Sequence, residues 1–199
     1  MVSAYRTIAT TSEGLFKDRG SKFLAFAFPV KNEDEVKEIL QQLRKQYHDA
    51  RHHCYAWKLG VDPPQHRAND DGEPSNSAGK PILNQIEKRN LTNTLVVVIR
   101  YFGGTLLGVG GLINAYRSAT EDALNNNRVI RRKVQQSYRL EFGYPDMNNV
   151  MGIVKEMQLD TENQVFELSC SMTVKVDLEQ EPELVRRLEL LDSCHYEKI

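Results

Sequence analysis

Five consecutive aliphatic residues, Leu95 to Ile99, constrain the fold of this chain more than any other feature. Most of them are β-branched and the run is short, which predicts a strand at the centre of a sheet, buried on both faces. A glycine-rich segment follows, and an amphipathic pattern then predicts a helix over residues 112–124. A central strand that leads through glycines into a helix indicates a domain in which helices cover a β-sheet.

The first 130 residues show alternating strand-like and helix-like patterns. Apolar and aromatic residues predict strands over 21–30 and 52–59. Between these strands, Asn32 can cap a helix whose apolar residues recur at intervals of three and four. A short helix is predicted over 81–88, after a polar stretch at 61–78 that we expect to be a long loop.

The pattern changes after a basic connector, residues 128–133. The predicted elements that follow are a strand at 138–142, a helix at 145–157, two strands within 164–176, a helix at 181–191 and a strand at 195–199. This βαββαβ order is typical of ferredoxin-like domains. The sequence therefore predicts an α+β protein with an N-terminal β-α domain, residues 1–134, and a ferredoxin-like C-terminal domain, residues 135–199.

The two predicted domains carry opposite charge. Residues 1–134 hold 20 Lys and Arg against 14 Asp and Glu, a net charge of +6, whereas residues 135–199 hold 6 against 13, a net charge of −7. A basic excess permits contact with a polyanion such as RNA, and an acidic domain is suited to a protein partner.

The chain has the features of a cytoplasmic protein. The three cysteines are an odd number and widely spaced, which fits a reducing compartment better than a disulfide framework. The N-terminus lacks the pattern of a signal peptide, and no apolar run approaches the length of about 20 residues that spans a bilayer. We therefore expect no membrane partner.

The glycine-rich segment after the central strand is a candidate anion site. Glycines let backbone N–H groups approach a phosphate closely, and a helix N-terminus adds partial positive charge. The candidate phosphate-binding residues are Lys80, Arg100, Gly103, Gly104, Gly108, Gly110, Gly111 and Arg117. The alternative is that the glycines only permit tight packing. The spacing does not match the dinucleotide-binding motif. Tyr101 and Phe102 can either stack on a base or join the core.

A second candidate is the polar run NDDGEPSNSAGK at residues 69–80. Three carboxylates within four residues can coordinate Mg²⁺, although a solvated turn is the alternative interpretation. The spacing and Pro81 exclude a Walker nucleotide site. The residues of this possible polar cleft are Asp70, Asp71, Glu73, Ser75, Ser77, His53 and Tyr55.

Histidines and cysteines provide no recognised site. His52, His53 and Cys54 lie close in the sequence, but no four residues have the spacing of a zinc site. No pattern typical of a serine or cysteine nucleophile is present. We therefore predict no catalytic residue, metal or cofactor. The state of the Cys54 thiol, the oligomeric state and the identity of the partner stay open.

These motifs, taken together and in this order, resemble the IMPACT family, in particular its bacterial YigZ branch. The residues that carry the resemblance are 21–25 (SKFLA), 53–56 (HCYA), 70–75 (DDGEPS), 78–83 (AGKPIL) and 97–112 (VVIRYFGGTLLGVGGL). The match spans roughly residues 15–125, and the second domain resembles the ferredoxin-like appendage of that branch. The chain departs from the family at Asn76-Ser77, where Gly-Thr is usual, and at Asn114, where a basic residue is common.

The resemblance implies an N-terminal fold similar to a small-subunit ribosomal protein and to domain four of elongation factor G. It implies a C-terminal module similar to domain five of that factor. Eukaryotic members are translation regulators that bind the activator of an initiation-factor kinase and restrain that kinase. The resemblance therefore adds a translational context.

Three functions stay open at this point. The favoured one is a non-enzymatic, translation-associated regulatory factor that contacts RNA or the ribosome through its basic N-terminal domain. Lys80, Arg100 and the glycine segment would bind phosphates, and the acidic C-terminal domain would dock a protein. The first alternative is a Mg²⁺-dependent enzyme that acts on a phosphorylated ligand at the DDGEP and glycine segments. The second alternative is a protein-docking adaptor.

Overall fold

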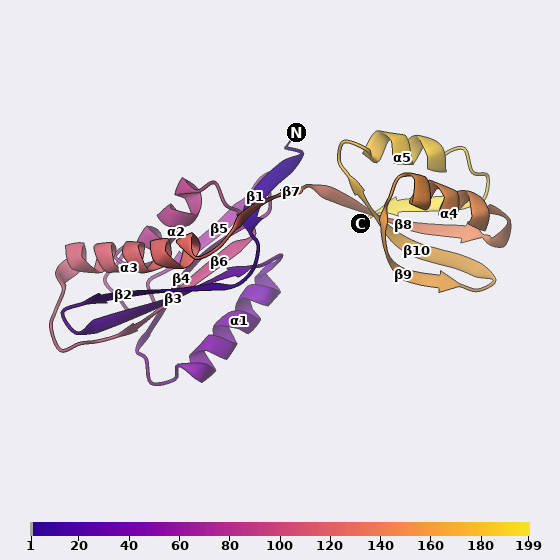
Figure 1. Cartoon of the computed structure of the whole chain (residues 1–199). Helices are drawn as coiled ribbons and strands as arrows, with labels where there is room; N and C mark the ends of the chain where they lie inside the picture. The colour runs from indigo at the N-terminus through magenta and orange to yellow at the C-terminus, as the bar shows by residue number, and fades with distance from the viewer. Residues whose placement is uncertain (1) are drawn as a thin grey trace. The chain divides into compact units, whose positions relative to one another are not determined.

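The computed structural model describes residues 2–199, which form two compact units (Figure 1). The N-terminal unit is residues 5–132. The C-terminal unit is residues 133–199 together with the described residues before Tyr5. The N-terminal stretch therefore groups with the second unit, although the sequence placed all of residues 1–134 in the first domain. Among the described residues, none of the helices is both long and apolar enough to cross a membrane.

The N-terminal unit is a five-stranded antiparallel sheet with helices on both faces (Figure 1). Its strands are β2 (Ser12–Asp18), β3 (Ser21–Pro29), β4 (His52–Leu59), β5 (Gln65–Asn69) and β6 (Thr94–Tyr101). Its helices are α1 (Glu33–Gln46), α2 (Gly79–Lys88) and α3 (Gly108–Asn125). The strand order is β2-β3-β6-β4-β5, while β1 (Ala4–Ile8) and β7 (Val129–Lys133) pair in a separate two-stranded sheet.

Strand β6 lies at the centre of the sheet, as the aliphatic run predicted. Every residue from Thr94 to Arg100 is buried. Its side chains alternate between two cores: Val96 and Val98 pack with α2 and α3, whereas Leu95, Val97 and Ile99 pack on the face that α1 covers. This alternation defines a helix α2–α3 face, on which the polar cluster described below lies, and a helix α1 face.

The sequence missed several elements of the N-terminal unit. Strand β5 lies inside the stretch that was predicted to be a long loop. The prediction was wrong because the residues of β5 are mostly exposed and polar and show no apolar alternation. Strands β1 and β2 precede the first predicted strand, and the basic connector is strand β7. Helix α3 begins at Gly108, four residues earlier than expected, so the last three glycines of the segment belong to its first turn.

The C-terminal unit has the predicted ferredoxin-like fold. Its elements, in chain order, are β8 (Gln135–Gly143), the 3₁₀ turn η1 (Tyr144–Asp146), α4 (Met147–Glu156), β9 (Asp160–Phe166), β10 (Ser169–Asp177), α5 (Glu181–Leu188) and β11 (Cys194–Lys198). The sheet order is β11-β8-β10-β9, and α4 and α5 pack on one face around an apolar core. The turn between β9 and β10 is at residues 167–168, slightly before the expected hinge at 169–171.

Candidate functional site

A polar cluster lies at one end of the N-terminal sheet, on the α2–α3 face. Strand register places Phe23 of β3 and His52 of β4 on either side of Arg100 in β6. Strand residues two apart point to the same face, so Arg100 follows Val98 toward the helices α2 and α3. A charged side chain therefore enters the edge of an otherwise apolar core.

Arg100 forms a buried ion pair with Glu73. Its Nη1 donates to both carboxylate oxygens of Glu73, at 2.7 and 2.9 Å, and the two side chains are only 7% and 4% exposed. The hydroxyl of Tyr116 in α3 donates to Glu73 Oε1 at 2.7 Å. Arg100 Nε is buried and has no hydrogen-bond partner among the described residues. The pair fixes the loop after β5 against the centre of the sheet.

The thiol of Cys54 lies beside this pair but is not activated. Its Sγ is 3.3 Å from the Tyr116 hydroxyl oxygen and 3.0 Å from the Asp70 carbonyl oxygen. Burial strongly raises the pKa of Cys54, and it also strongly raises the pKa of Tyr116. Both groups are neutral near pH 7, and a neutral thiol is a poor nucleophile.

The three carboxylates of the DDGEP run have separate structural partners. Asp70 accepts from the backbone N–H groups of Ala78 and Gly79 at 3.0 and 2.8 Å, at the start of α2. Asp71 accepts from Arg44 at 2.8 Å and from the backbone N–H of His53 at 2.6 Å.

The pKa of Asp71 reflects these contacts. Burial alone would raise it, but the hydrogen bonds from Arg44 and His53 outweigh burial and hold the pKa below its usual value. Within residues 2–199, no three His, Cys, Asp or Glu side chains are grouped so that they could hold a metal ion.

The other residues of the possible polar cleft do not converge. His53 and Tyr55 are buried on the α1 face, where His53 Nε2 lies 3.1 Å from the carbonyl oxygen of Tyr47. Ser77 is buried and donates to the carbonyl of Pro74 at 2.6 Å, whereas Ser75 is exposed. The structure thus brings Glu73 to Arg100 and Asp70 to α2, and it leaves His53 and Tyr55 on the opposite face.

The glycine segment forms an exposed surface next to the buried pair. Gly103 packs tightly on the β2–β3 turn: its N–H donates to Ser21 Oγ at 3.1 Å, and a Cβ added to it would lie 1.9 Å from the carbonyl carbon of Gly20. Gly104 and Gly108 have φ of +89° and +70° with open space around them. Helix α3 starts at Gly108 without a side-chain cap, so its first N–H groups face no capping side chain.

Three basic residues lie on the β2–β3 hairpin, whose turn contacts this segment; Lys17 and Lys22, paired in the register with each other and with Tyr101, are on the α1 face. Lys17, Arg19 and Lys22 are exposed, and the turn that carries Arg19 is the one that contacts Gly103. None of the three is among the predicted site residues: no strand was predicted before Ser21, so the hairpin that carries Lys17 and Arg19 was not recognised. The Asp-Arg-Gly turn at residues 18–20, between two strand-like stretches, was the available signal.

Lys80 and Arg117, the other predicted phosphate ligands, are both exposed. Lys80 is the second residue of α2. Arg117 lies on α3 and donates to Asn114 Oδ1 at 2.6 Å. Their role as ligands stays a prediction.

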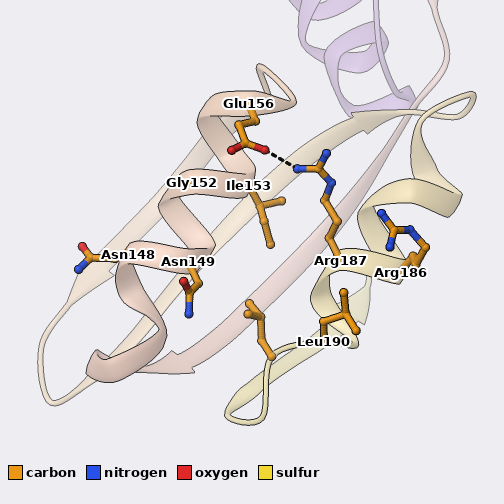
Figure 2. Close-up of a pocket in the computed structure, with 9 residues that line it drawn as sticks. Asn148, Asn149, Gly152, Ile153, Glu156, Arg186, Arg187 and Leu190 are labelled. Atoms are coloured by element: carbon orange, nitrogen blue, oxygen red, sulfur yellow. Dashed lines mark hydrogen bonds and ion pairs between the residues drawn. The ribbon is translucent and has the colours of Figure 1, made fainter.

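The C-terminal unit contains a groove of about 410 Å³ between α4 and α5 (Figure 2). Ile153 and Leu190 contribute apolar side chains, and Arg187 bridges the groove to Glu156 at 2.6 Å. Figure 2 shows this one ion pair, while Arg186 pairs with Glu183, which is not drawn.

Comparison with known proteins places the chain in a family. The family described as "Impact N-terminal domain" matches residues 19–124. The chain is 36% identical to the IMPACT family member YvyE of Bacillus subtilis (strain 168), over 79% of this chain and 73% of that protein. It is 32% identical to the IMPACT family member YigZ of Escherichia coli (strain K12), over 74% of this chain and 75% of that protein.

A solved structure resembles both units. The crystal structure of a hypothetical protein covers 100% of this chain, which covers 98% of it, with 26% sequence identity and a TM-score of 0.79. The sequence motifs, the fold and these relatives agree, and the chain belongs to the IMPACT family.

Proposed function

We propose that this protein is a non-enzymatic, translation-associated factor whose N-terminal unit contacts RNA, free or in the ribosome, through the phosphate groups. The observation that carries the proposal is the β2–β3 hairpin, which exposes Lys17, Arg19 and Lys22 and whose turn packs on Gly103 of the exposed glycine segment. Exposed cationic side chains and uncapped backbone N–H groups are both suited to a chain of phosphates. The translational context comes from the family resemblance.

The charge distribution supports the N-terminal unit as the contacting part. Residues 135–199 have a net charge of −7 and would repel a polyanion, whereas residues 1–134 have a net charge of +6. We propose that the acidic unit is left free for a protein partner. No contact within residues 2–199 favours the alternative of a Mg²⁺-dependent enzyme, because Asp70, Asp71 and Glu73 are each engaged elsewhere.

The test is the salt dependence of RNA binding by the full chain. A variant with Lys17→Gln, Arg19→Gln and Lys22→Gln removes three positive charges at the hairpin. If all three contact phosphates, the slope of log K against log salt falls by about 2, since each contact contributes about 0.7 for single strands. Fluorescence anisotropy with a labelled RNA at several salt concentrations measures this slope.

The matched control removes three exposed basic residues away from the hairpin: Arg6 in β1, Lys31 after β3 and Lys88 in the last turn of α2. Substituted by Gln, this triple variant has the same net charge as the test variant. A smaller slope only for the hairpin variant supports the proposal, whereas equal losses indicate a diffuse charge effect and contradict it. Single Lys80→Gln and Arg117→Gln variants then show whether those residues belong to the contact surface.

A further inference from the structure

The buried pair supports an exposed aromatic ring. The guanidinium carbon of Arg100 lies 5.6 Å from the ring centroid of Phe23 and 5.6 Å from that of Phe102. Phe23 is fully buried, whereas Phe102 is 52% exposed. From this layered arrangement we propose that Phe102 is the stacking platform for an unpaired base of single-stranded RNA; the inference rests on the proposed function.

The inner layers hold the platform in place. Arg100 is fixed by its two hydrogen bonds to Glu73 and cannot rotate freely. Phe23 packs edge-on against Tyr116, with 5.1 Å between the ring centroids. A ring held by a cation on its inner side keeps its outer side available and loses little entropy when a flat partner binds there.

The surroundings favour a nucleic acid over other flat or apolar partners. Arg19 is exposed in the β2–β3 turn that packs on Gly103, the residue after Phe102. Lys17 and Lys22 are exposed on the same hairpin, but Lys22 is the register partner of Tyr101 and so lies on the α1 face. Arg19 at this turn can hold the backbone of a strand while a base reaches the ring. In a duplex the faces of all but the terminal bases are covered by their neighbours, so an unpaired base is the partner that fits Phe102.

This arrangement gives Arg100 a different role from that of a phosphate ligand. Its charge is balanced by Glu73, and its side chain is 7% exposed. Arg100 is a positioning residue: it acts through Phe102 rather than on the RNA. Tyr101, the other aromatic residue of the motif, is turned to the α1 face and donates to Asp49 at 2.8 Å, so it is not part of the platform.

The experiment compares the full chain with a Phe102→Leu variant, which keeps an apolar side chain but removes the flat ring. The probes are a short single-stranded RNA that carries 2-aminopurine and a blunt RNA duplex of the same sequence. We expect Phe102→Leu to weaken single-strand binding about tenfold and to remove the stacking-induced quenching, with duplex binding unchanged. Phe102→Trp should retain both the affinity and the quenching.

A matched control is Phe166→Leu, since Phe166 is a 44% exposed phenylalanine in the C-terminal unit. If Phe102→Leu keeps wild-type affinity and quenching, Phe102 does not stack on a base and this inference is wrong. A smaller salt slope in the hairpin variant would still support the phosphate contact. An equal loss on the duplex would also overturn it, because the ring would then not be contacting a base. If the unaltered protein binds neither RNA at low salt, the proposed function itself fails.

Discussion

The two units differ in how many polar side chains they bury. Among the described residues, the buried polar or charged side chains of the N-terminal unit are Thr7, Ser12, Ser21, His53, Ser77, Gln85, Thr92, Thr94, Arg100 and Thr120. The C-terminal unit buries one, Thr173. Its ion pairs are at the surface, such as Arg186 with Glu183 and Lys198 with Glu181. Both units nevertheless form ordered sheets with apolar cores.

This difference shows that a sheet covered by helices does not require a buried charge. Surface ion pairs contribute little to stability, and a buried pair often contributes no more than an apolar replacement of the same shape. The Arg100–Glu73 pair is therefore not explained by the fold alone. Its position under Phe102 and next to the glycine segment is consistent with a role in holding an exposed surface in one geometry.

The largest effect is expected when the buried pair is broken. Arg100→Met leaves the Glu73 carboxylate, 4% exposed, without its cation, and such changes cost about 3–5 kcal/mol. The free energy of unfolding is measured with urea and the fluorescence of Trp57, the single tryptophan, which is buried in the N-terminal unit. The double variant Arg100→Met, Glu73→Leu should lose less than the single variant, because no uncompensated charge remains.

The control for this comparison is Arg187→Met in the C-terminal unit. Arg187 pairs with Glu156 and Glu183 at the surface, and its loss should leave the Trp57 transition unchanged. If the double variant is as unstable as Arg100→Met alone, the cost comes from lost packing rather than from the unpaired carboxylate.

A smaller effect is expected at the glycine segment. A Cβ on Gly103 would meet the backbone of the β2–β3 turn, so Gly103→Ala forces two main chains apart and should cost about 1–3 kcal/mol in the Trp57 transition.

Gly152 in α4 has open space around its Cβ position, and Gly152→Ala should stabilise the C-terminal unit by about 0.5–1 kcal/mol. Thermal unfolding followed by circular dichroism measures the second change. Equal effects at the two positions would contradict the assigned contact between Gly103 and Gly20.

Much of the fold could be predicted because its apolar patterns are strong. The aliphatic run at 95–99 identified β6, and Asn32 caps α1, with its side-chain oxygen 2.9 Å from the backbone nitrogen of Glu35. Strand β5 could not be predicted, since it lies at the sheet edge with mostly exposed side chains and has no apolar period. The early start of α3 was hidden because glycine has a low helix propensity.

The site could be predicted only in part. Sequence proximity suggested that Asp70, Asp71 and Glu73 act together, but the backbone directs each carboxylate to a different partner. The pairing of Glu73 with Arg100 joins residues 27 positions apart, and strand register is needed to see it. The exposure of Phe102, in contrast to the contact of Tyr101 with Asp49, likewise depends on which face each residue takes at the end of β6.

The smallest expected effect is a pH dependence confined to the N-terminal unit. Burial lowers the pKa of His53, with the nearby Arg44 charge acting in the same direction and Asp71 opposing it. The native state therefore binds a proton less readily than the unfolded chain, whose histidines titrate near 6.5. The stability that neutral His53 contributes is present above about pH 6.5 and is lost as the pH falls, with a slope of at most about 1.4 kcal/mol per pH unit.

In His53→Gln, which can still donate to the Tyr47 carbonyl, this part of the slope should disappear. Urea unfolding of Trp57 between pH 5.5 and 7.5 (about one unit on either side of 6.5) tests it. The same slope in the variant would show that another group is responsible.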